Sequence, residues 1–426
     1  MDIKKEGKFF SDSLLQEIRD KFYYVDSDPY EKRIYFENAG GSLTLKSVLK
    51  LINEFGALPD SPNRPSLASE VLKKMVNKGR EDVKLFLGAK DGKVVADETA
   101  SRLIFMLTGT IIENIPGTNV VTTFLEHPSS YDACTVYAKK TGKELRIANT
   151  NPIDGSVNPK EILSKIDKNT CLLSFIASSN ITGKNLKLKQ IIEEARKIKP
   201  DLFIFLDATQ YVAHFPIDVE KLGIDGAAFN QYKVFGKRTM GLGWVSERVS
   251  ILPHEKFLEQ PIDEWDVGGS EPTGYGSWSS VVDYICWVGS HFTDSKDRRS
   301  LILSGMENIM LQERALLEYA LNGSDKIDGL RKMNHVDIHF FPEDEDLSTR
   351  VLLLPITIKG KDNNDVVQEY LKNGIIVYAR VRKNAMSRRI LDSFNCEGII
   401  RVTPLHCNSK EEIDRFLEVT RSIVSK

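Results

Sequence analysis

The stretch that decides the fold, Phe205 to Val249, reads FLDATQYVAHFPIDVEKLGIDGAAFNQYKVFGKRTMGLGWVSERV. An apolar run, 202–206, stops abruptly at Asp207, and a second apolar run, 226–229, leads through a polar turn to Lys233. An apolar run that closes on a carboxylate is typical of a buried parallel strand whose carboxyl end opens into a ligand crevice. Asp207 is therefore a candidate functional residue.

Lys233 has two interpretations, a solvated surface cation or a buried amine that forms a Schiff base. A lysine is almost never fully buried without a partner, which favours the surface cation. The flanking residues favour the other interpretation, because Asn230, Gln231 and Tyr232 precede the lysine and Gly236 follows it. A polar turn of this kind directly after a strand suits a phosphate-binding loop.

Three segments of this stretch resemble the active-site segment of class V aminotransferases, a group of fold-type I pyridoxal-phosphate (PLP) enzymes that includes cysteine desulfurases and selenocysteine lyases. The matching segments are Asp207-Ala-Thr-Gln210, Pro216-Ile-Asp-Val219 and Asn230-Gln-Tyr-Lys233. The resemblance implies an α/β fold-type I PLP-dependent transferase. It would have a large domain with a mostly parallel sheet and a small C-terminal α+β domain.

The resemblance also implies roles for these residues. Lys233 would form a Schiff base with the PLP aldehyde and later carry a proton. Asp207 would keep the ring nitrogen protonated, because a neighbouring carboxylate favours the charged form. Gln210 would bond the ring hydroxyl, while Asn230 and Tyr232 would contact the phosphate.

Further site candidates follow predicted strands or begin predicted helices. Thr99 and Ala100 begin an apolar helix, where a threonine is usually a cap, and the resemblance adds a phosphate contact at the helix N-terminus. His127 follows the strand 120–125 and would stack on the cofactor ring, with proton transfer as a second role. Asn180 follows the strand 171–177 and would reach towards the ring hydroxyl and the substrate carboxylate.

The resemblance places the substrate carboxylate near the C-terminal domain. Arg401 ends an apolar strand, and a guanidinium can hold a carboxylate through two parallel hydrogen bonds, although such an arginine is often only a salt-bridge partner. Asn38 and Gly40 lie in the Asn38-Ala-Gly-Gly41 turn that resembles a family segment near that carboxylate. Gly276 and Ser277 lie in a Gly- and Ser-rich stretch, which is either a flexible loop or a loop that crosses to the neighbouring subunit's phosphate. A loop that crosses to the neighbouring subunit implies a homodimer.

Length and element order predict the domains. With 426 residues the chain exceeds one typical domain. We expect a helical N-terminal segment, 1–33, that packs with the small domain, a large PLP-binding domain at 34–290 and a small α+β domain at 291–426.

Composition excludes several classes of partner. The net charge of −2 produces no field that favours nucleic acid or a membrane surface. No run of eighteen apolar residues occurs, and the N-terminus is charged rather than signal-like, which predicts a cytoplasmic protein. The five cysteines lack metal-ligand spacing, so we expect free thiols and no metal.

The family resemblance does not fix the reaction, because one scaffold supports several chemistries. In desulfurases a nucleophilic cysteine precedes the carboxylate-binding arginine, but residues 380–394 contain none, and Cys396 lies too close to Arg401. The basic residues of this segment either receive a second anionic group or form a solvated loop: Arg380, Arg382, Lys383, Arg388 and Arg389. We rank cleavage of a Cβ–S or similar bond ahead of transamination and epimerisation. A catalytically silent scaffold protein is the alternative from another class.

Overall fold

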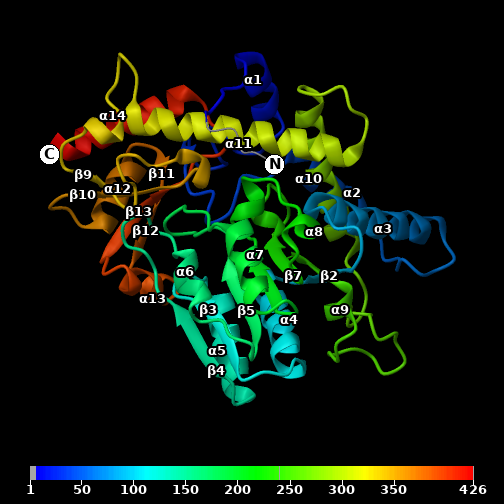
Figure 1. The fold of residues 1–426 in the computed structure, drawn as a ribbon. Helices are drawn as coiled ribbons and strands as arrows, with labels where there is room; N and C mark the ends of the chain where they lie inside the picture. The colour runs from blue at the N-terminus through cyan, green and yellow to red at the C-terminus, as the bar shows by residue number, and fades with distance from the viewer. Residues whose placement is uncertain (1–5, 239, 426) are drawn as a thin grey trace.

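A seven-stranded sheet forms the centre of the molecule in the computed structural model, which describes residues 6–238 and 240–425 (Figure 1). The strand order is β2-β8-β7-β6-β5-β3-β4, and β3 to β7 run parallel while β8 is antiparallel to both of its neighbours. The bounds are β2 (Lys93–Asp97), β3 (Asn119–Thr123), β4 (Glu144–Ala148), β5 (Thr170–Ile176), β6 (Phe203–Asp207), β7 (Gly226–Asn230) and β8 (Gly241–Val245). The predicted mostly parallel sheet is present.

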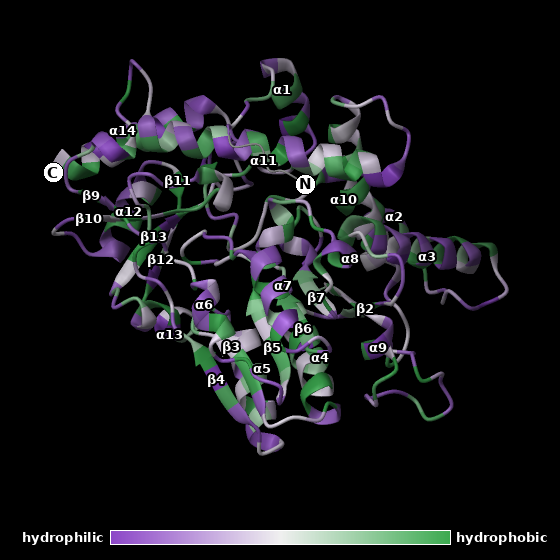
Figure 2. Ribbon diagram, viewed as in Figure 1, coloured by the Kyte–Doolittle hydropathy of each residue, from purple (hydrophilic) through white to green (hydrophobic). Residues whose placement is uncertain are grey.

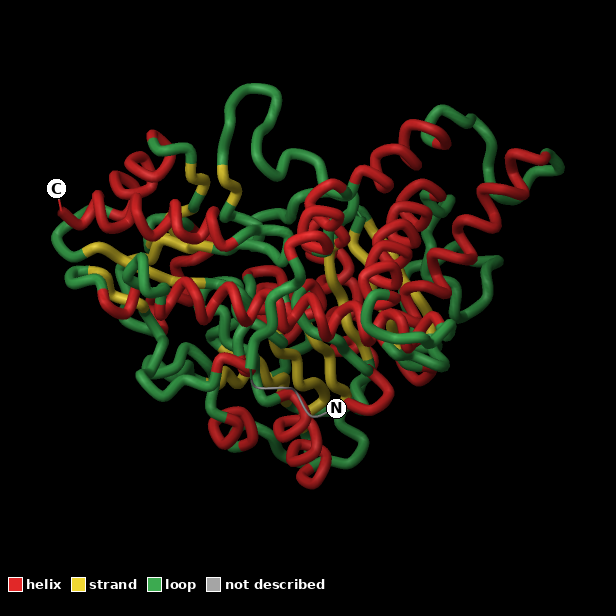
Figure 3. The backbone as a smooth tube through the Cα atoms, turned by 90° about the horizontal axis from the view of Figure 1, so that it is seen from above, coloured by secondary structure: helices red, strands yellow, loops and turns green. Residues whose placement is uncertain are grey.

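Alternate residues of these strands enter two different cores, because successive side chains of a strand point to opposite faces. Val120, Leu172 and Phe205 belong to one hydrophobic cluster, whereas their neighbours Val121 and Leu173 belong to the other. The central strands are therefore apolar along most of their length, as Figure 2 shows by their green colour. Helices cover both faces of the sheet (Figure 3).

The helices on the two faces come from different parts of the chain. One face is covered by α4 (Ala100–Asn114) and α5 (Pro128–Lys140). The other is covered by α3 (Leu67–Leu87), α7 (Leu188–Ile198) and α10 (Pro272–Ser290). Shorter helices complete this part of the molecule: α2 (Lys46–Phe55), α6 (Pro159–Leu163), α8 (Val219–Leu222) and α9 (Glu247–Ser250).

The C-terminal part contains a second, antiparallel sheet of order β12-β13-β10-β9. Its strands are β9 (Val336–Ile338), β10 (Leu354–Ile358), β12 (Tyr378–Val381) and β13 (Gly398–Val402), packed with α12 (Asn363–Lys372) and α14 (Lys410–Ser425). The long helix α11 (Arg298–Asn322) joins the two parts, as its first half lies in the large core cluster and its second half in the small one.

The N-terminal segment differs from the expected continuous helix. Residues 1–5 of the predicted segment lie outside the described residues, and α1 covers only Asp12–Asp20, with the Ser11 hydroxyl as its cap. The chain then extends to β1 (Ile34–Tyr35), which pairs in parallel with β11 (Ile375–Ile376) of the C-terminal part. This pairing places the turn that follows β1 beside the large sheet.

Two segments expected to be loops are helical. The second part of the Gly- and Ser-rich stretch, from Pro272, forms the first half of α10, and the basic segment forms the end of β12 followed by α13 (Ala385–Ser393). Within the described part of the chain, no helix combines the length and the apolar character needed to cross a membrane.

Candidate functional site

Four neighbouring parallel strands end at one edge of the large sheet, and a predicted site residue follows each. His127 follows β3, Asn180 follows β5, Asp207 closes β6, and Lys233 follows β7. Carboxyl ends of parallel strands form the ligand crevice of α/β sheets. The strand order therefore brings together residues that lie far apart in the sequence.

Asp207 is buried, with 2% of its surface exposed. Its Oδ2 accepts a hydrogen bond from the Ser130 hydroxyl at 3.1 Å, and its Oδ1 accepts one from the Thr209 amide at 3.1 Å. These two bonds fix the carboxylate at the strand end. Ser130 was not predicted as a site residue, because a serine inside the first turn of a helix such as α5 gives no sequence signal of a functional role.

Lys233 lies in a short 3₁₀ turn directly after β7. Its Nζ donates a hydrogen bond to the carbonyl oxygen of Ala39, which also accepts from Gln210 Nε2 at 3.1 Å. Burial, assisted by repulsion from Arg401, lowers the pKa of the Lys233 amine to about 7. A large share of the amine is thus neutral and nucleophilic near neutral pH.

His127 is the N-cap of α5, and its Nδ1 accepts a hydrogen bond from the Ser129 amide at 3.2 Å. Burial lowers the pKa of His127, and the positive charges of Lys233 and Arg380 act in the same direction while Asp207 opposes them. A neutral ring whose Nδ1 accepts carries its proton on Nε2. The geometry therefore sets one tautomer.

Glu126 precedes His127 and is fully buried. Its Oε1 accepts hydrogen bonds from the Thr123 hydroxyl at 2.7 Å and the Ile176 amide at 3.0 Å. Its Oε2 has no hydrogen-bond partner among the described residues. Burial raises the pKa of Glu126 to about 8, so a neutral carboxylic acid lies beside the candidate site at neutral pH.

The N-terminus of α4 meets the end of β7. Thr99 is the N-cap of α4, with its hydroxyl oxygen accepting from the Arg102 amide at 3.2 Å, and the Ala100 amide donates to Asn230 Oδ1 at 2.9 Å. Two cations lie over the Tyr232 ring: Lys233 Nζ is 5.0 Å and Arg238 Cζ is 4.8 Å from the ring centroid. The predicted phosphate residues are thus neighbours, and the Asn230 oxygen already occupies the Ala100 amide.

Arg401 is fully buried on β13 and pairs with Glu37, a residue that sequence analysis did not select. Its Nε donates to Glu37 Oε2 at 3.2 Å, one terminal nitrogen donates to Glu37 Oε1, and the other donates to the Asn180 carbonyl at 2.9 Å. Gly40 permits this approach, because a Cβ there would collide with Glu37 Oε1. Arg401 therefore contacts Asn180 directly and also pairs with the turn that begins at Glu37.

Asn38 has a structural role in that turn. Its Nδ2 donates to the carbonyl oxygens of Thr403 at 2.9 Å and Tyr35 at 3.2 Å, and its Oδ1 accepts from the Leu43 amide at 3.1 Å. These bonds connect the turn to the C-terminal part of the chain. Because of these bonds, the Asn38 side-chain amide has little remaining hydrogen-bonding capacity for a substrate.

The sequence predicted that Ser277 lies on a loop, but in the structure it lies in a helix. It is fully buried within α10, and its hydroxyl donates to the Thr273 carbonyl at 2.5 Å. The neighbouring Gly276 packs against Met75 of α3. Both residues therefore lie in a helix rather than on a loop, and their contact with a neighbouring subunit's phosphate stays a prediction.

The site residues fit a cofactor of the PLP type. Asn180 Oδ1 is buried with no partner among the described residues, so a donor is missing there. The amine of Lys233 and the carboxylate of Asp207 lie at the ends of adjacent strands, as an aldehyde carbon and a basic ring nitrogen require. Several guanidinium groups around Lys233 supply positive charge for a phosphate and a carboxylate: Arg401, Arg380 and Arg238.

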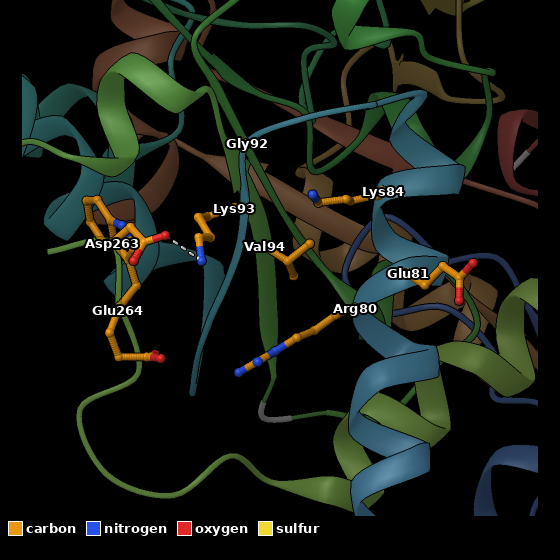
Figure 4. Close-up of a pocket in the computed structure, with 9 residues that line it drawn as sticks. Arg80, Glu81, Lys84, Gly92, Lys93, Val94, Asp263 and Glu264 are labelled. Atoms are coloured by element: carbon orange, nitrogen blue, oxygen red, sulfur yellow. Dashed lines mark ion pairs between the residues drawn. The ribbon is translucent and has the colours of Figure 1, made fainter. Parts of the chain in front are cut away.

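Two of the surface pockets in the described part of the chain lie outside this constellation. A pocket of about 250 Å³ between α3 and β2 has charged walls that pair with one another, such as Lys93 with Asp263 at 2.6 Å (Figure 4). A second pocket, of about 540 Å³, lies beside α13 and includes Phe124 and Arg389. Arg389 donates to the carbonyl oxygens of Phe124 and Glu126, so it is anchored to the loop that carries His127.

Comparisons with known proteins agree with this geometry. The model of the aminotransferase class-V family matches residues 34–263, more than half of the chain. A probable cysteine desulfurase 2 of Mycobacterium leprae is 25% identical over 266 residues, which is 60% of this chain and 61% of that protein. A cysteine desulfurase of Haloferax volcanii is 22% identical over 90% of this chain and 88% of its own length.

A solved structure shows the same fold. The apo structure of a cysteine desulfurase from Thermococcus onnurineus superposes with a TM-score of 0.80 at 20% identity, over 96% of this chain and 98% of that one. The predicted α/β fold-type I architecture is confirmed.

Proposed function

The chain belongs to the class-V aminotransferase family, and on that premise we propose that it cleaves the Cβ–S bond, or a similar bond, of an amino acid or amino-acid conjugate. It is a PLP-dependent enzyme, as the members of this family are. The observation that carries the proposal is the convergence of a low-pKa Lys233 amine and the buried Asp207 carboxylate at one sheet edge. Relatives named cysteine desulfurases support the choice of bond.

PLP in this site supplies an aldehyde for a Schiff base with Lys233 and an electron-accepting ring. Asp207, fixed by Ser130 and Thr209, would hold a proton at the ring nitrogen. His127 would cover one face of the ring. Once freed by the substrate amine, Lys233 Nζ would accept the proton from the substrate α-carbon, and the electron pair of the Cβ–S bond would leave with sulfur.

The sulfur is released directly rather than passed to a protein thiol. Cys396 is the half-buried cysteine nearest to Arg401 in sequence, and burial raises the pKa of its thiol. Its Sγ faces the Gly398 carbonyl at 3.5 Å. A protonated thiol held in this way is a poor nucleophile.

A product assay tests the proposal. Purified protein with PLP should absorb as a yellow holoenzyme, and borohydride should fix the cofactor to the peptide that contains Lys233. With L-cysteine and related amino acids, pyruvate and sulfide should form without addition of a keto-acid acceptor. A strict keto-acid requirement would instead identify an aminotransferase, inversion at the α-carbon an epimerase, and absence of PLP uptake a scaffold protein.

A homodimer and a cytoplasmic location stay predictions. Sedimentation velocity of the holoenzyme tests the first, and fractionation of cells tests the second. A monomer with full activity would show that the site is complete within one chain.

A further inference from the structure

The loop that carries Asn180 is bound by the C-terminal part of the chain. This Asn180 loop, residues 178–184, follows β5, and three of its carbonyl oxygens accept hydrogen bonds from that part. The three bonds run from Arg401 Nη1 to Asn180 at 2.9 Å, from Arg350 Nη1 to Thr182 at 3.0 Å and from the Val351 amide to Gly183 at 3.0 Å. The position of Asn180 therefore depends on residues from another part of the fold.

Arg350 makes most of the side-chain contacts at this junction. The residue is buried, with 3% of its surface exposed. Besides Thr182, its guanidinium donates from Nη2 to the carbonyl oxygens of Asp154, at 2.8 Å, and Phe340, and its Nε pairs with Glu345 at 2.9 Å. A planar guanidinium with an acceptor at each nitrogen holds its partners in one geometry. Arg350 thus fixes the Asn180 loop against the segment that precedes α6.

Glu345 supplies the opposite charge. Its Oε1 accepts from Arg350 Nε and from Nζ of Lys184, the last residue of the Asn180 loop, which also donates to the Thr349 hydroxyl at 2.9 Å. The side chains of Glu345 and Arg350 are 4% and 0% exposed. Removal of one member of a buried charge group leaves the others uncompensated. Lys184, Glu345 and Arg350, here called the junction cluster, therefore bind the end of the loop to the C-terminal part.

Close packing restricts the Asn180 loop further. Gly183 has a φ of +74°, and a Cβ there would lie 3.0 Å from Leu353 Cβ. A Cβ on Gly155 would lie 2.7 Å from Thr182 Cβ. Approaches this close favour glycine. Asn180 Oδ1 is buried with no partner among the described residues, so the restricted loop presents an unsatisfied acceptor.

One sheet carries both arginines that bind the loop. Arg350 lies just before β10, and β10 pairs with β13, where Pro355 lies opposite Arg401. The hydrogen bonds between the two strands keep the two guanidinium groups at a fixed spacing. Asn180 and Arg401, the candidate for the substrate carboxylate, are therefore positioned by the same sheet.

We propose that Arg350 is a positioning residue for the cofactor: through the junction cluster it fixes the Asn180 loop so that the Asn180 amide meets the ring hydroxyl of PLP. This inference rests on the proposed function, because it requires the PLP ring at the ends of β5 and β6. In this role Arg350 acts through the backbone of the loop rather than by contact with the cofactor. A change at Arg350 should then affect the cofactor as a change at Asn180 does, and the two effects should not add.

The first test is a pH titration of the yellow absorbance of PLP bound at Lys233. Asn180→Ala should move the midpoint by about one pH unit, because a hydrogen bond to one protonation state of the ring hydroxyl favours that state. Arg350→Met should move the midpoint in the same direction, by about half a unit or more. The double variant should move it no further than Asn180→Ala alone, because both changes act on one hydrogen bond.

Arg19→Met is the matched control for the loss of a largely buried arginine. Arg19 of α1 pairs with Glu412 of α14 at 2.9 Å, and the two side chains are 12% and 10% exposed. Its replacement should lower the melting temperature, as Arg350→Met does, and leave the absorbance midpoint unchanged. A shift in Arg19→Met as large as that in Arg350→Met would mean that the midpoint follows stability, and would overturn the proposal.

The second test measures hydrogen exchange of the apoprotein by mass spectrometry. The Gly183 amide donates to the Ser179 carbonyl and the Asn185 amide to the Thr349 carbonyl, both at 3.0 Å. In Arg350→Met the peptide that covers 178–185 should exchange at least about tenfold faster than in wild type, whereas Arg19→Met should leave it unchanged. If Arg350→Met does not fold, Glu345→Gln takes its place in both tests. It removes the charge but keeps an acceptor, so smaller changes in the same direction are expected.

The two proposals fail in different ways. If wild type takes up PLP but converts no amino acid, the proposed reaction is wrong, and the titration still decides the role of Arg350. If wild type is active while Arg350→Met keeps the wild-type midpoint and exchange rate, the reaction stands and the role of Arg350 is wrong. A midpoint shift that adds fully to that of Asn180→Ala would also overturn the role, because Arg350 would then act independently of Asn180.

Discussion

Lys233 Nζ donates a hydrogen bond to the carbonyl oxygen of Ala39, so a turn near the N-terminus directs the amine at the end of β7. The same carbonyl accepts from Gln210 Nε2, which lies just after β6. One backbone oxygen thus connects three segments that are distant in sequence. Burial of the amine lowers the Lys233 pKa to about 7, so its charge state changes near neutral pH.

We expect the rate of PLP uptake by the apoprotein to rise with pH, with a midpoint near the Lys233 pKa of about 7. Only the unprotonated amine attacks an aldehyde, so uptake is slow below the pKa and reaches a plateau above it. Stopped-flow absorbance across pH 5.5 to 9 measures the rate. Lys233→Ala should abolish borohydride-stable labelling, whereas the neighbouring Lys237→Ala should not. A midpoint near 10 would contradict the burial of the amine.

Asp207→Asn should lower turnover by at least about 100-fold, equivalent to roughly 2.7 kcal/mol in the activation free energy. The amide cannot stabilise a positive ring nitrogen, which the carboxylate does. Ser130→Ala removes only one bond to Asp207 Oδ2 and should cost less than about tenfold. Steady-state kinetics at matched PLP content separates the two effects. Equal losses for both variants would mean that Asp207 acts through its orientation rather than its charge.

Glu126→Gln should remove a pH dependence of folding stability. Burial raises the pKa of Glu126 from 4.5 to about 8, so between these values the folded state binds more protons than the unfolded state. Stability contributed by the neutral acid is therefore present at low pH and lost as pH rises to about 8. The loss is on the order of a few kcal/mol.

Urea unfolding of both proteins at pH 5.5 and 8.5 tests this. Wild type should lose more stability than Glu126→Gln on going to pH 8.5. Glu54→Gln, on an exposed position of α2, serves as the control and should behave like wild type. Parallel pH profiles for wild type and Glu126→Gln would show that Glu126 titrates normally.

The strand-end residues were predictable because buried parallel strands have continuous apolar sequences that stop at a polar residue. That signal located Asp207, Lys233, His127 and Asn180. It could not locate the Glu37–Arg401 pair, because the two residues meet only through the pairing of Glu37 with Thr403, far apart in the sequence. Tertiary contacts of this kind leave no local pattern.

The first half of helix α10 was missed for a different reason. Glycine and serine predict a loop by their propensities, but Gly276 and Gly289 let α10 approach α3 and α11 more closely than larger residues permit. Helix α13 has a weak pattern among basic residues. Its signals are the Asn384 cap, which accepts from the Met386 amide, and the buried pair Ile390 and Leu391.

Cys396→Ser should leave sulfide release from L-cysteine within about twofold of wild type. The thiol has a raised pKa through burial and faces the Gly398 carbonyl, so it is neither ionised nor directed at a substrate. Sulfide and pyruvate measured from the same sample should stay equimolar in both proteins, because sulfur leaves directly. Cys134→Ser, at a buried position in α5, controls for general effects of thiol removal on folding. Formation of alanine in place of pyruvate by wild type, and its loss with Cys396→Ser, would show instead that this thiol accepts the sulfur as a persulfide.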